Sequence, residues 1–180
     1  MKSTVIIISL LLLPFVIYSQ SIEKSGKDEF TGNPIIWTSW TGLSAKAIFP
    51  TKYSKGIDFM LRYEDSRVFL HLKWYESINR INKDSELLLK MSNGSILTLH
   101  AITDFDADIY VYTNLDKSHS QNNIHVVYEG DLSALAGNDL VEKIRLNTIY
   151  GSRAFELNEK NAQKLSKAYK LIMDEIEKID

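Results

Sequence analysis

The stretch IDFMLRYEDSRVFLHLKW, residues 57–74, decides the fold, because apolar residues alternate on both sides of a central Asp65-Ser66. A two-residue turn at Asp65-Ser66 predicts an antiparallel hairpin. One face of this hairpin is wholly apolar and pairs Ile57 with Trp74, Phe59 with Leu72, Leu61 with Leu70, and Tyr63 with Val68. A slip of one residue would turn these side chains to the opposite face, so the sequence specifies the register well.

The second face of the same hairpin is mixed. It pairs Asp58 with Lys73, Met60 with His71, and Arg62 with Phe69. These pairs predict an ion pair and a cation over an aromatic ring. His71 is therefore expected to be a hydrogen-bonded histidine of the sheet.

Two more hairpins are predicted further along the chain. Asn93-Gly94 is typical of a type I′ turn, because both residues tolerate a positive φ. This turn pairs Leu89 with Thr98, Leu88 with Leu99, and Leu87 with His100. Both faces then carry apolar residues, which favours strands in the interior of the sheet. Gly151-Ser152 predicts a type II′ turn that pairs Leu146 with Leu157, and Thr148 with Phe155.

Shorter segments extend the predicted sheet. Alternating runs at residues 35–40, 109–113 and 124–129 predict further strands. The polar residues 114–123 are interpreted as a long connection. Asp131 is expected to cap a short helical turn that Gly137 closes.

The last segment of the chain changes from strand to helix periodicity. From Asn158, which is the predicted N-cap, apolar residues recur every three or four positions, namely Ala162, Leu165, Tyr169, Ile172, Ile176 and Ile179. Lys160, Lys164 and Lys167 lie nearly opposite this stripe and are interpreted as its solvated side. The order of elements predicts an α+β fold, an antiparallel sheet or half-sandwich of about 8 to 10 short strands in hairpins, covered by a long C-terminal amphipathic helix.

The first twenty residues are typical of a secretory signal peptide. Lys2 is basic, residues 5–16 are apolar, and Ser19 and Ser21 are small residues at the expected cleavage position. The apolar run is shorter than the roughly 20 residues that span a bilayer. We therefore expect residues 1–20 to be removed, residues 21–180 to form a single domain without an integral membrane segment, and the protein to be exported, periplasmic or secreted.

Composition excludes several classes of partner. The net charge is −2, and it becomes more negative when Lys2 leaves with the leader, which argues against nucleic acid as a partner. The chain contains no cysteine, so neither a disulfide nor a thiol nucleophile is available. Gly-rich phosphate loops and the G-x-S-x-G pattern are also missing from the sequence, and no cofactor is expected.

One acidic run has the spacing that begins a calcium loop. Asp104, Asp106 and Asp108 alternate as D-x-D-x-D. Ile109 stands where that loop needs a glycine, and Leu115 stands where it needs a closing glutamate. We therefore expect no metal site here, and the preferred interpretation is an acidic approach to an edge strand.

The four histidines show no zinc-ligand spacing. His100 is expected to be a hydrogen-bonded sheet histidine like His71. A hydrolase-type enzyme with a site assembled around His100, Asp104 and Asp106 remains the alternative function, because catalytic residues converge in space rather than in sequence.

The N-terminal segment carries a resemblance. The run Asp28-Glu29-Phe30-Thr31-Gly32, followed by a strand that ends in Thr38-Ser39-Trp40, resembles the mature N-termini of small exported bacterial proteins of unknown role. The resemblance implies an exported domain and supplies no catalytic residues. The preferred function is a non-catalytic domain that binds a small ligand, a glycan or a partner protein.

Aromatic residues on strands are the candidate ligand-binding residues of this domain, and they are Trp37, Trp40, Tyr75, Tyr110 and Tyr112. Strand alternation places Ile36, Thr38 and Trp40 on one face, and Ile35, Trp37 and Ser39 on the other. One of the two tryptophans is therefore expected to be buried and the other to lie near the surface.

Overall fold

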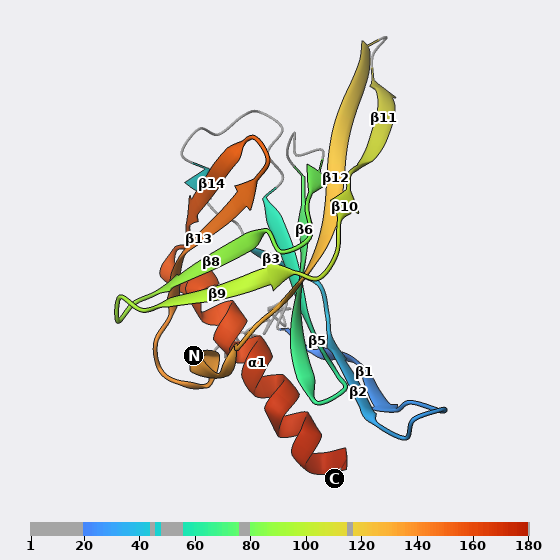
Figure 1. Ribbon diagram of the computed structural model, residues 1–180, viewed down its shortest axis with the longest axis vertical. Helices are drawn as coiled ribbons and strands as arrows, with labels where there is room; N and C mark the ends of the chain where they lie inside the picture. Colours follow the sequence, from blue (N-terminus) through green and yellow to red (C-terminus); the bar gives the residue numbers. More distant parts are fainter. Residues whose placement is uncertain (1–19, 44–45, 48–55, 76–79, 115–116, 180) are drawn as a thin grey trace, which may run out of the picture.

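The computed structural model describes residues 20–43, 46–47, 56–75, 80–114 and 117–179, without the side chains of residues 46–47 and 109–122. This part of the chain is mostly antiparallel sheet with a single C-terminal α-helix (Figure 1). The predicted α+β fold class is confirmed. The predicted leader lies almost entirely outside the described residues.

The elements follow one another in a simple order, with the sheet first and the helix last. The strands of the N-terminal half are β1 (Ile22–Lys27), β2 (Pro34–Thr38), β3 (Thr41–Leu43), β4 (Lys46–Ala47), β5 (Ile57–Glu64), β6 (Arg67–Trp74) and β7 (Arg80–Ile81). The remaining elements are β8 (Glu86–Met91), β9 (Ile96–Ala101), β10 (Phe105–Asp106), β11 (Asp108–Asn114), β12 (Lys117–Glu129), the 3₁₀ helix η1 (Ser133–Ala136), β13 (Val141–Thr148), β14 (Gly151–Glu156) and α1 (Glu159–Ile179).

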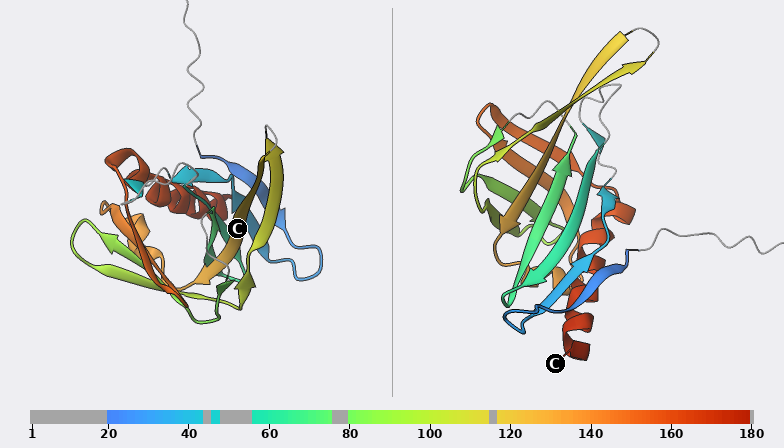
Figure 2. Two further views of the ribbon diagram at one scale, coloured as in Figure 1. Left: turned by 90° about the horizontal axis from the view of Figure 1, so that it is seen from above. Right: turned by 90° about the vertical axis from the view of Figure 1, so that its right-hand side faces the viewer.

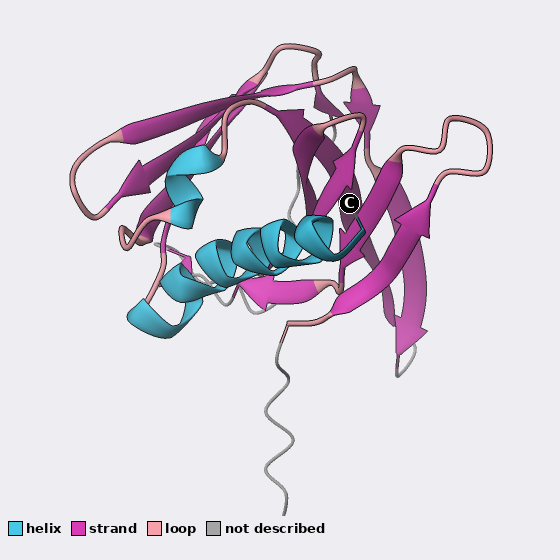
Figure 3. Cartoon of the chain, turned by 90° about the horizontal axis from the view of Figure 1, so that it is seen from below, coloured by secondary structure: helices cyan, strands magenta, loops and turns pink. Residues whose placement is uncertain are grey.

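One large sheet holds almost all of these strands. Its order is β1-β2-β5-β6-β12-β9-β8-β13-β14-β4, with β3 added beside β5 and β11 beside β12. The strands β7 and β10 form a small separate ribbon. The large sheet is strongly curved, and Figures 2 and 3 show α1 lying along its concave side. The apolar stripe of α1 and the inward faces of the strands form one core.

The β5–β6 hairpin has the predicted register. Ile57 pairs with Trp74, Phe59 with Leu72, Leu61 with Leu70, and Tyr63 with Val68. Asp65 and Ser66 have φ values of 49° and 59°, as a type I′ turn requires. The pattern predicted this hairpin because only one register buries its apolar face.

The predicted register of the second hairpin is wrong by one residue. Leu87 pairs with Leu99, and Leu89 pairs with Leu97. The Gly94 N–H donates to the Met91 carbonyl, and Gly94 has a φ of 86°, which indicates a longer loop with a bulged glycine rather than a two-residue turn. This register places Leu87, Leu89, Leu97 and Leu99 on one face and leaves Leu88 on the other. The other face is largely polar. β8 and β9 lie in the interior of the sheet, between β12 and β13, as predicted.

The third hairpin turns two residues earlier than predicted. Thr148 pairs with Gly151, so Ile149 and Tyr150 form the turn. The Thr148 hydroxyl donates to the Gly151 carbonyl over 2.7 Å and accepts the Tyr150 N–H over 3.1 Å. This register buries Phe155 opposite Ile144. The side chain of Thr148 fixes the turn, and this local bond was not anticipated.

Residues 114–123 were predicted to be a polar connection, and this prediction is wrong. Most of them belong to β12, which pairs with β11 from Asp108 opposite Asn123 to Asn114 opposite Lys117. The two strands form an arm that projects from the body of the sheet (Figure 1). An arm of this kind needs no apolar face, so hydrophobic alternation does not reveal it.

The helix α1 begins and packs as predicted. The Asn161 N–H donates to Asn158 Oδ1 over 3.0 Å, which is an N-cap bond. Leu165, Ala168 and Ile172 are completely buried. Lys164 is an exception to the predicted solvated side, because its Nζ donates to the Gly42 carbonyl of β3 over 2.5 Å. The helix therefore contacts the sheet through both its apolar stripe and one lysine.

Candidate functional site

The convex side of the sheet carries the candidate site, because the core fills most of the concave side. Outward residues of β5, β6 and β12 lie side by side in the sheet register, with Met60 next to His71, and Lys73 next to His125. Beyond β5, the segment from β2 to β3 adds two tryptophans to this side. We call the resulting surface the outer aromatic face, and it consists of Lys24, Trp37, Trp40, Arg62, His71, Lys73 and His125.

Trp37 lies between two cations. The Lys24 ammonium nitrogen is 4.8 Å from the centroid of the indole ring, and the Arg62 guanidinium carbon is 5.0 Å from it. Both distances are within the range of a cation–π contact. Arg62 also forms an ion pair with Glu64. The Trp37 side chain is thus held in place while it stays half-exposed.

Trp40 has a third cation and a histidine as neighbours. The Lys73 Nζ lies 3.9 Å from the centroid of the Trp40 ring. The ring of His125 meets the same indole edge-on, with centroids 5.3 Å apart and planes at 78°. Trp40 is half-buried, so part of its surface remains open to a ligand.

His71 and His125 form a hydrogen-bonded pair beside Trp40. His71 Nδ1 is 3.0 Å from His125 Nε2. His71 is only 6% exposed, and its Nε2 has no hydrogen-bond partner among the described residues. An unpaired buried N–H is costly, so we assign the proton to His71 Nδ1, which donates to His125.

The pair is held in its neutral form. Burial lowers the pKa of His71 to about 4, and the neighbouring His125 and Arg62 add to this shift. Burial and the Lys73 ammonium also lower the pKa of His125. Both histidines are therefore uncharged at neutral pH, and Lys24, Arg62 and Lys73 carry the positive charge of the face.

The expectation that one tryptophan is buried and the other exposed is wrong. Both are half-buried and both contribute to the outer aromatic face. Alternation fails because the strand stops at Thr38, whose buried side-chain oxygen accepts the Leu61 N–H over 3.0 Å. This side-chain bond takes the place of a backbone hydrogen bond between β2 and β5. The strand alternation is therefore interrupted, and Trp40 does not lie on the same face as Ile36 and Thr38.

The remaining aromatic candidates are not among the residues of the outer aromatic face. Tyr75 is half-buried, and its hydroxyl donates to Asp58 Oδ2 over 2.9 Å. Tyr110 and Tyr112 lie on β11 opposite Gln121 and His119, and their side chains lie outside the described residues. The structure therefore brings Trp37 and Trp40 into one surface, with Tyr75 beside the same strands.

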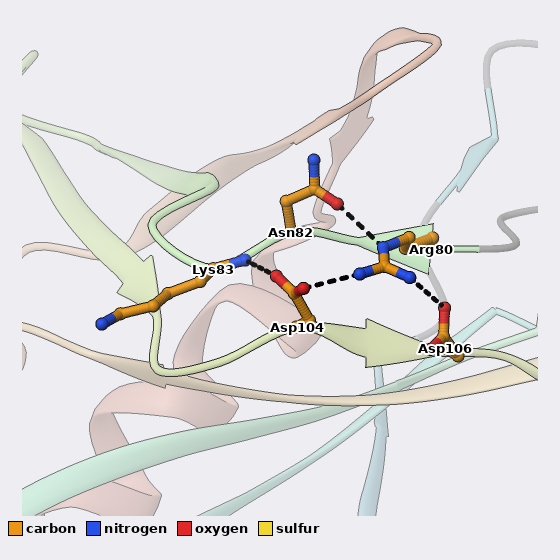
Figure 4. Close-up of polar contacts among 5 residues, drawn as sticks. All are labelled: Arg80, Asn82, Lys83, Asp104 and Asp106. Atoms are coloured by element: carbon orange, nitrogen blue, oxygen red, sulfur yellow. Dashed lines mark hydrogen bonds and ion pairs between the residues drawn. The ribbon is translucent and has the colours of Figure 1, made fainter.

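The acidic run is organised around an arginine (Figure 4). Arg80 Nη2 is 2.5 Å from Asp104 Oδ2, and Nη1 is 3.2 Å from Asp106 Oδ1. The Lys83 N–H donates to Asp104 Oδ1 over 2.7 Å, and this bond, with Arg80, lowers the pKa of Asp104. Both carboxylates thus connect β10 to the segment around β7.

Asp108 begins β11, and no described ion pair or hydrogen bond joins it to Arg80. Within the described ranges, no three His, Asp or Glu side chains are grouped so that they could hold a metal ion. His100 is exposed, and its Nδ1 is 3.4 Å from the Asp84 carbonyl oxygen. No described contact joins His100 to Asp104 or Asp106.

Sequence reasoning identified the two tryptophans but missed the groups that surround them. The predicted β5–β6 register already placed Arg62 and Lys73 on the outward side of the sheet, so the sequence was sufficient to find these two cations. The positions of Lys24 and His125 depend on the pairing of β1 with β2 and of β12 with β6. These pairings join segments far apart in the sequence, and alternation within one strand does not predict them.

Comparisons with known proteins add no function to this geometry. No protein-family model matches the chain. No curated protein and no solved structure matches it at a significant level. The function of this protein is therefore inferred from the arrangement of its residues.

Proposed function

We propose that this protein is an exported, non-catalytic domain that binds a ligand on its outer aromatic face. The observation that carries the proposal is the arrangement of Trp37 and Trp40, which lie half-exposed on one side of the sheet with a cation within 5.0 Å of each ring. Indole rings supply large contact area at low entropic cost, and tryptophan is enriched where binding energy concentrates.

The chemistry of the face favours an acidic glycan among the possible ligands. In the described part of the chain, neither Lys24 nor Lys73 forms an ion pair with a carboxylate. A cation–π contact at an exposed site contributes only about 0.5–1 kcal/mol, so these ammonium groups remain available to an anionic group. A uronic or sulfated sugar would offer that group together with an apolar ring face for the indoles.

The outer aromatic face also contains buried polar atoms that lower the stability of the fold. Buried polar atoms of Trp37, Arg62 and His71 lack hydrogen-bond partners among the described residues. Each such atom costs roughly 1–3 kcal/mol when it is fully desolvated. Each unsatisfied buried polar group in a native structure calls for an explanation, and a hydrogen bond to a bound ligand would be one for this face.

The hydrolase alternative has less support. Arg80 engages both Asp104 and Asp106, and His100 is hydrogen-bonded to a backbone carbonyl elsewhere. A general base needs an accessible lone pair and a substrate within reach. No observation favours a catalytic role for these three residues.

Export is part of the same proposal and derives from the signal-like leader. Among the described residues, no helix is both long enough and apolar enough to cross a membrane.

The proposal is tested by calorimetric titration with two matched oligosaccharides, one of galacturonic acid and one of neutral galactose. We expect only the acidic oligosaccharide to bind. Trp37→Ala and Trp40→Ala should each weaken its binding by about tenfold, which corresponds to about 1.4 kcal/mol. The control is Tyr150→Ala, because Tyr150 is a 72% exposed aromatic residue on a distant turn.

Two results would contradict the proposal. One is equal binding of the acidic and neutral sugars by the wild-type protein. The other is unchanged affinity in both tryptophan variants. A melting curve of each variant excludes loss of folding as the cause of weaker binding.

A further inference from the structure

A second candidate binding site lies away from the outer aromatic face. It is a cleft of about 790 Å³ between the C-terminal half of α1, the β5–β6 turn, and the segment that follows β12. Figure 1 shows these elements at the end of the molecule where the β5–β6 hairpin turns beside the helix. Nothing in the proposed glycan-binding function uses this cleft.

One wall of the cleft is apolar. Tyr169, Met173 and Ile176 face it from consecutive turns of α1, and Tyr63 and Val68 face it from the hairpin. Four of these side chains are only half-buried, and Tyr169 is the one that is mostly buried. The wall therefore presents apolar and aromatic surface that an organic ligand could cover.

The lining of the cleft also carries excess negative charge. Asp84, Glu129 and Asp131 all line it. Arg67 is the one arginine or lysine in the lining, and its Nη1 is 3.1 Å from Glu129 Oε2. This ion pair leaves the carboxylates of Asp84 and Asp131 without a cationic partner in the described part of the chain.

Asp131 lies close to Tyr169 of the apolar wall. Its carboxylate accepts the Ser133 N–H over 2.8 Å, which fixes its position at the start of η1. Burial raises the pKa of the Tyr169 hydroxyl, and the charge of Asp131 raises it further. A negative charge is thus held next to an aromatic ring, and both groups attract a cation.

We propose that this cleft binds an organic cation with an apolar body, such as an alkylammonium or arylammonium compound. The apolar body would cover Met173 and Ile176. The ammonium group would lie between the carboxylates of Asp84 and Asp131, near Tyr169. This ligand has the opposite charge to the ligand proposed for the outer aromatic face, so the two sites can be tested separately.

The probes are phenylbutylamine and phenylbutanoate, which share an apolar body and differ in the sign of the charged group. Binding is measured by calorimetry, and its position by backbone amide shifts in NMR spectra of the full-length protein. We expect the amine to bind and to shift amides of the β5–β6 turn, residues 129–132, and the C-terminal half of α1. We expect phenylbutanoate not to bind.

The variants are Asp84→Asn and Asp131→Asn. Both keep the shape of the side chain, and asparagine tolerates the φ of 63° at residue 84. Asparagine at 131 can still accept the Ser133 N–H. The double variant should bind the amine about tenfold more weakly, because it loses two favourable charge contacts. Glu142→Gln is the matched control, since Glu142 is exposed on β13 and lies outside the cleft.

Three results would overturn the inference. The first is binding of phenylbutanoate at least as tight as that of the amine. The second is unchanged amine affinity in the double variant, or an equal loss in Glu142→Gln. The third is the absence of amine binding to the wild-type protein.

Discussion

The contact between α1 and the sheet is expected to supply a large part of the stability of this fold. Leu165 and Ile172 are both completely buried in the core. Changing either to alanine removes buried methyl groups and leaves a cavity, which costs about 2–5 kcal/mol. Because the total stability of such a domain is only about 5–15 kcal/mol, the double variant should be close to unfolding.

Urea unfolding followed by circular dichroism and tryptophan fluorescence measures this effect. Trp74 is buried in the same core, so its fluorescence reports on loss of the packing. We expect each single variant to lower the free energy of unfolding by about 2–5 kcal/mol, with a fall in Tm of about 2–4 °C for each kcal/mol.

The matched controls are Lys160→Ala and Lys170→Ala, because both lysines are exposed on α1. They should change stability by about 0.5 kcal/mol or less. Lys164 is not a suitable control, since it donates a hydrogen bond to Gly42. If Leu165→Ala and Ile172→Ala were as stable as the lysine variants, the helix would not be part of the core, and the reasoning would be refuted.

The remaining predictions concern the histidine pair, one glycine and the leader. In the folded protein the pKa of His71 is about 4, below its ordinary value of 6.5, so between these two pH values the unfolded chain binds more protons than the folded one. The free energy of unfolding should therefore fall by about 2 kcal/mol from pH 7 to pH 5. Urea unfolding at several pH values checks this, and a stability that does not change with pH would contradict it. Gly130→Ala should destabilise the fold by about 1–3 kcal/mol, because a Cβ there would lie 2.6 Å from Leu99 Cδ2 and 2.9 Å from the Thr98 carbonyl oxygen. Thermal unfolding measures this effect, and Gly26→Ala is the control, because nothing lies within 4 Å of a Cβ at residue 26. N-terminal sequencing of protein recovered from the cell envelope or the medium should give a start near Gln20 or Ile22, and an intact Met1 would exclude cleavage.

The sequence predicted those parts of the fold in which a single face had to be buried. The β5–β6 hairpin and α1 are of this kind, because their apolar residues fit only one register or one helical stripe. The predicted registers of the hairpins at Gly94 and Gly151 differ from the observed ones, because local hydrogen bonds of the loop, such as those of Thr148, fix the turn. Such bonds leave no periodic signal in the sequence.

The candidate site could be predicted only in part for a related reason. Trp37 and Trp40 are recognisable as aromatic residues on a strand, but their shared face depends on the interruption at Thr38. Lys24 and His125 come from strands that are paired with distant segments. The order of strands in the sheet decides which of these side chains meet, and strand order is not encoded in alternation.

The most direct test of the central claim uses the indole N–H signals of the three tryptophans during NMR titration with the galacturonic acid oligosaccharide. Trp37 and Trp40 lie on the outer aromatic face, whereas Trp74 is 1% exposed in the core. Single Trp→Phe variants assign the three signals. Binding at the outer aromatic face predicts that the Trp37 and Trp40 signals shift together and saturate at one ligand concentration, while the Trp74 signal stays in place. Saturation of binding with no change in the Trp37 and Trp40 signals would contradict the account.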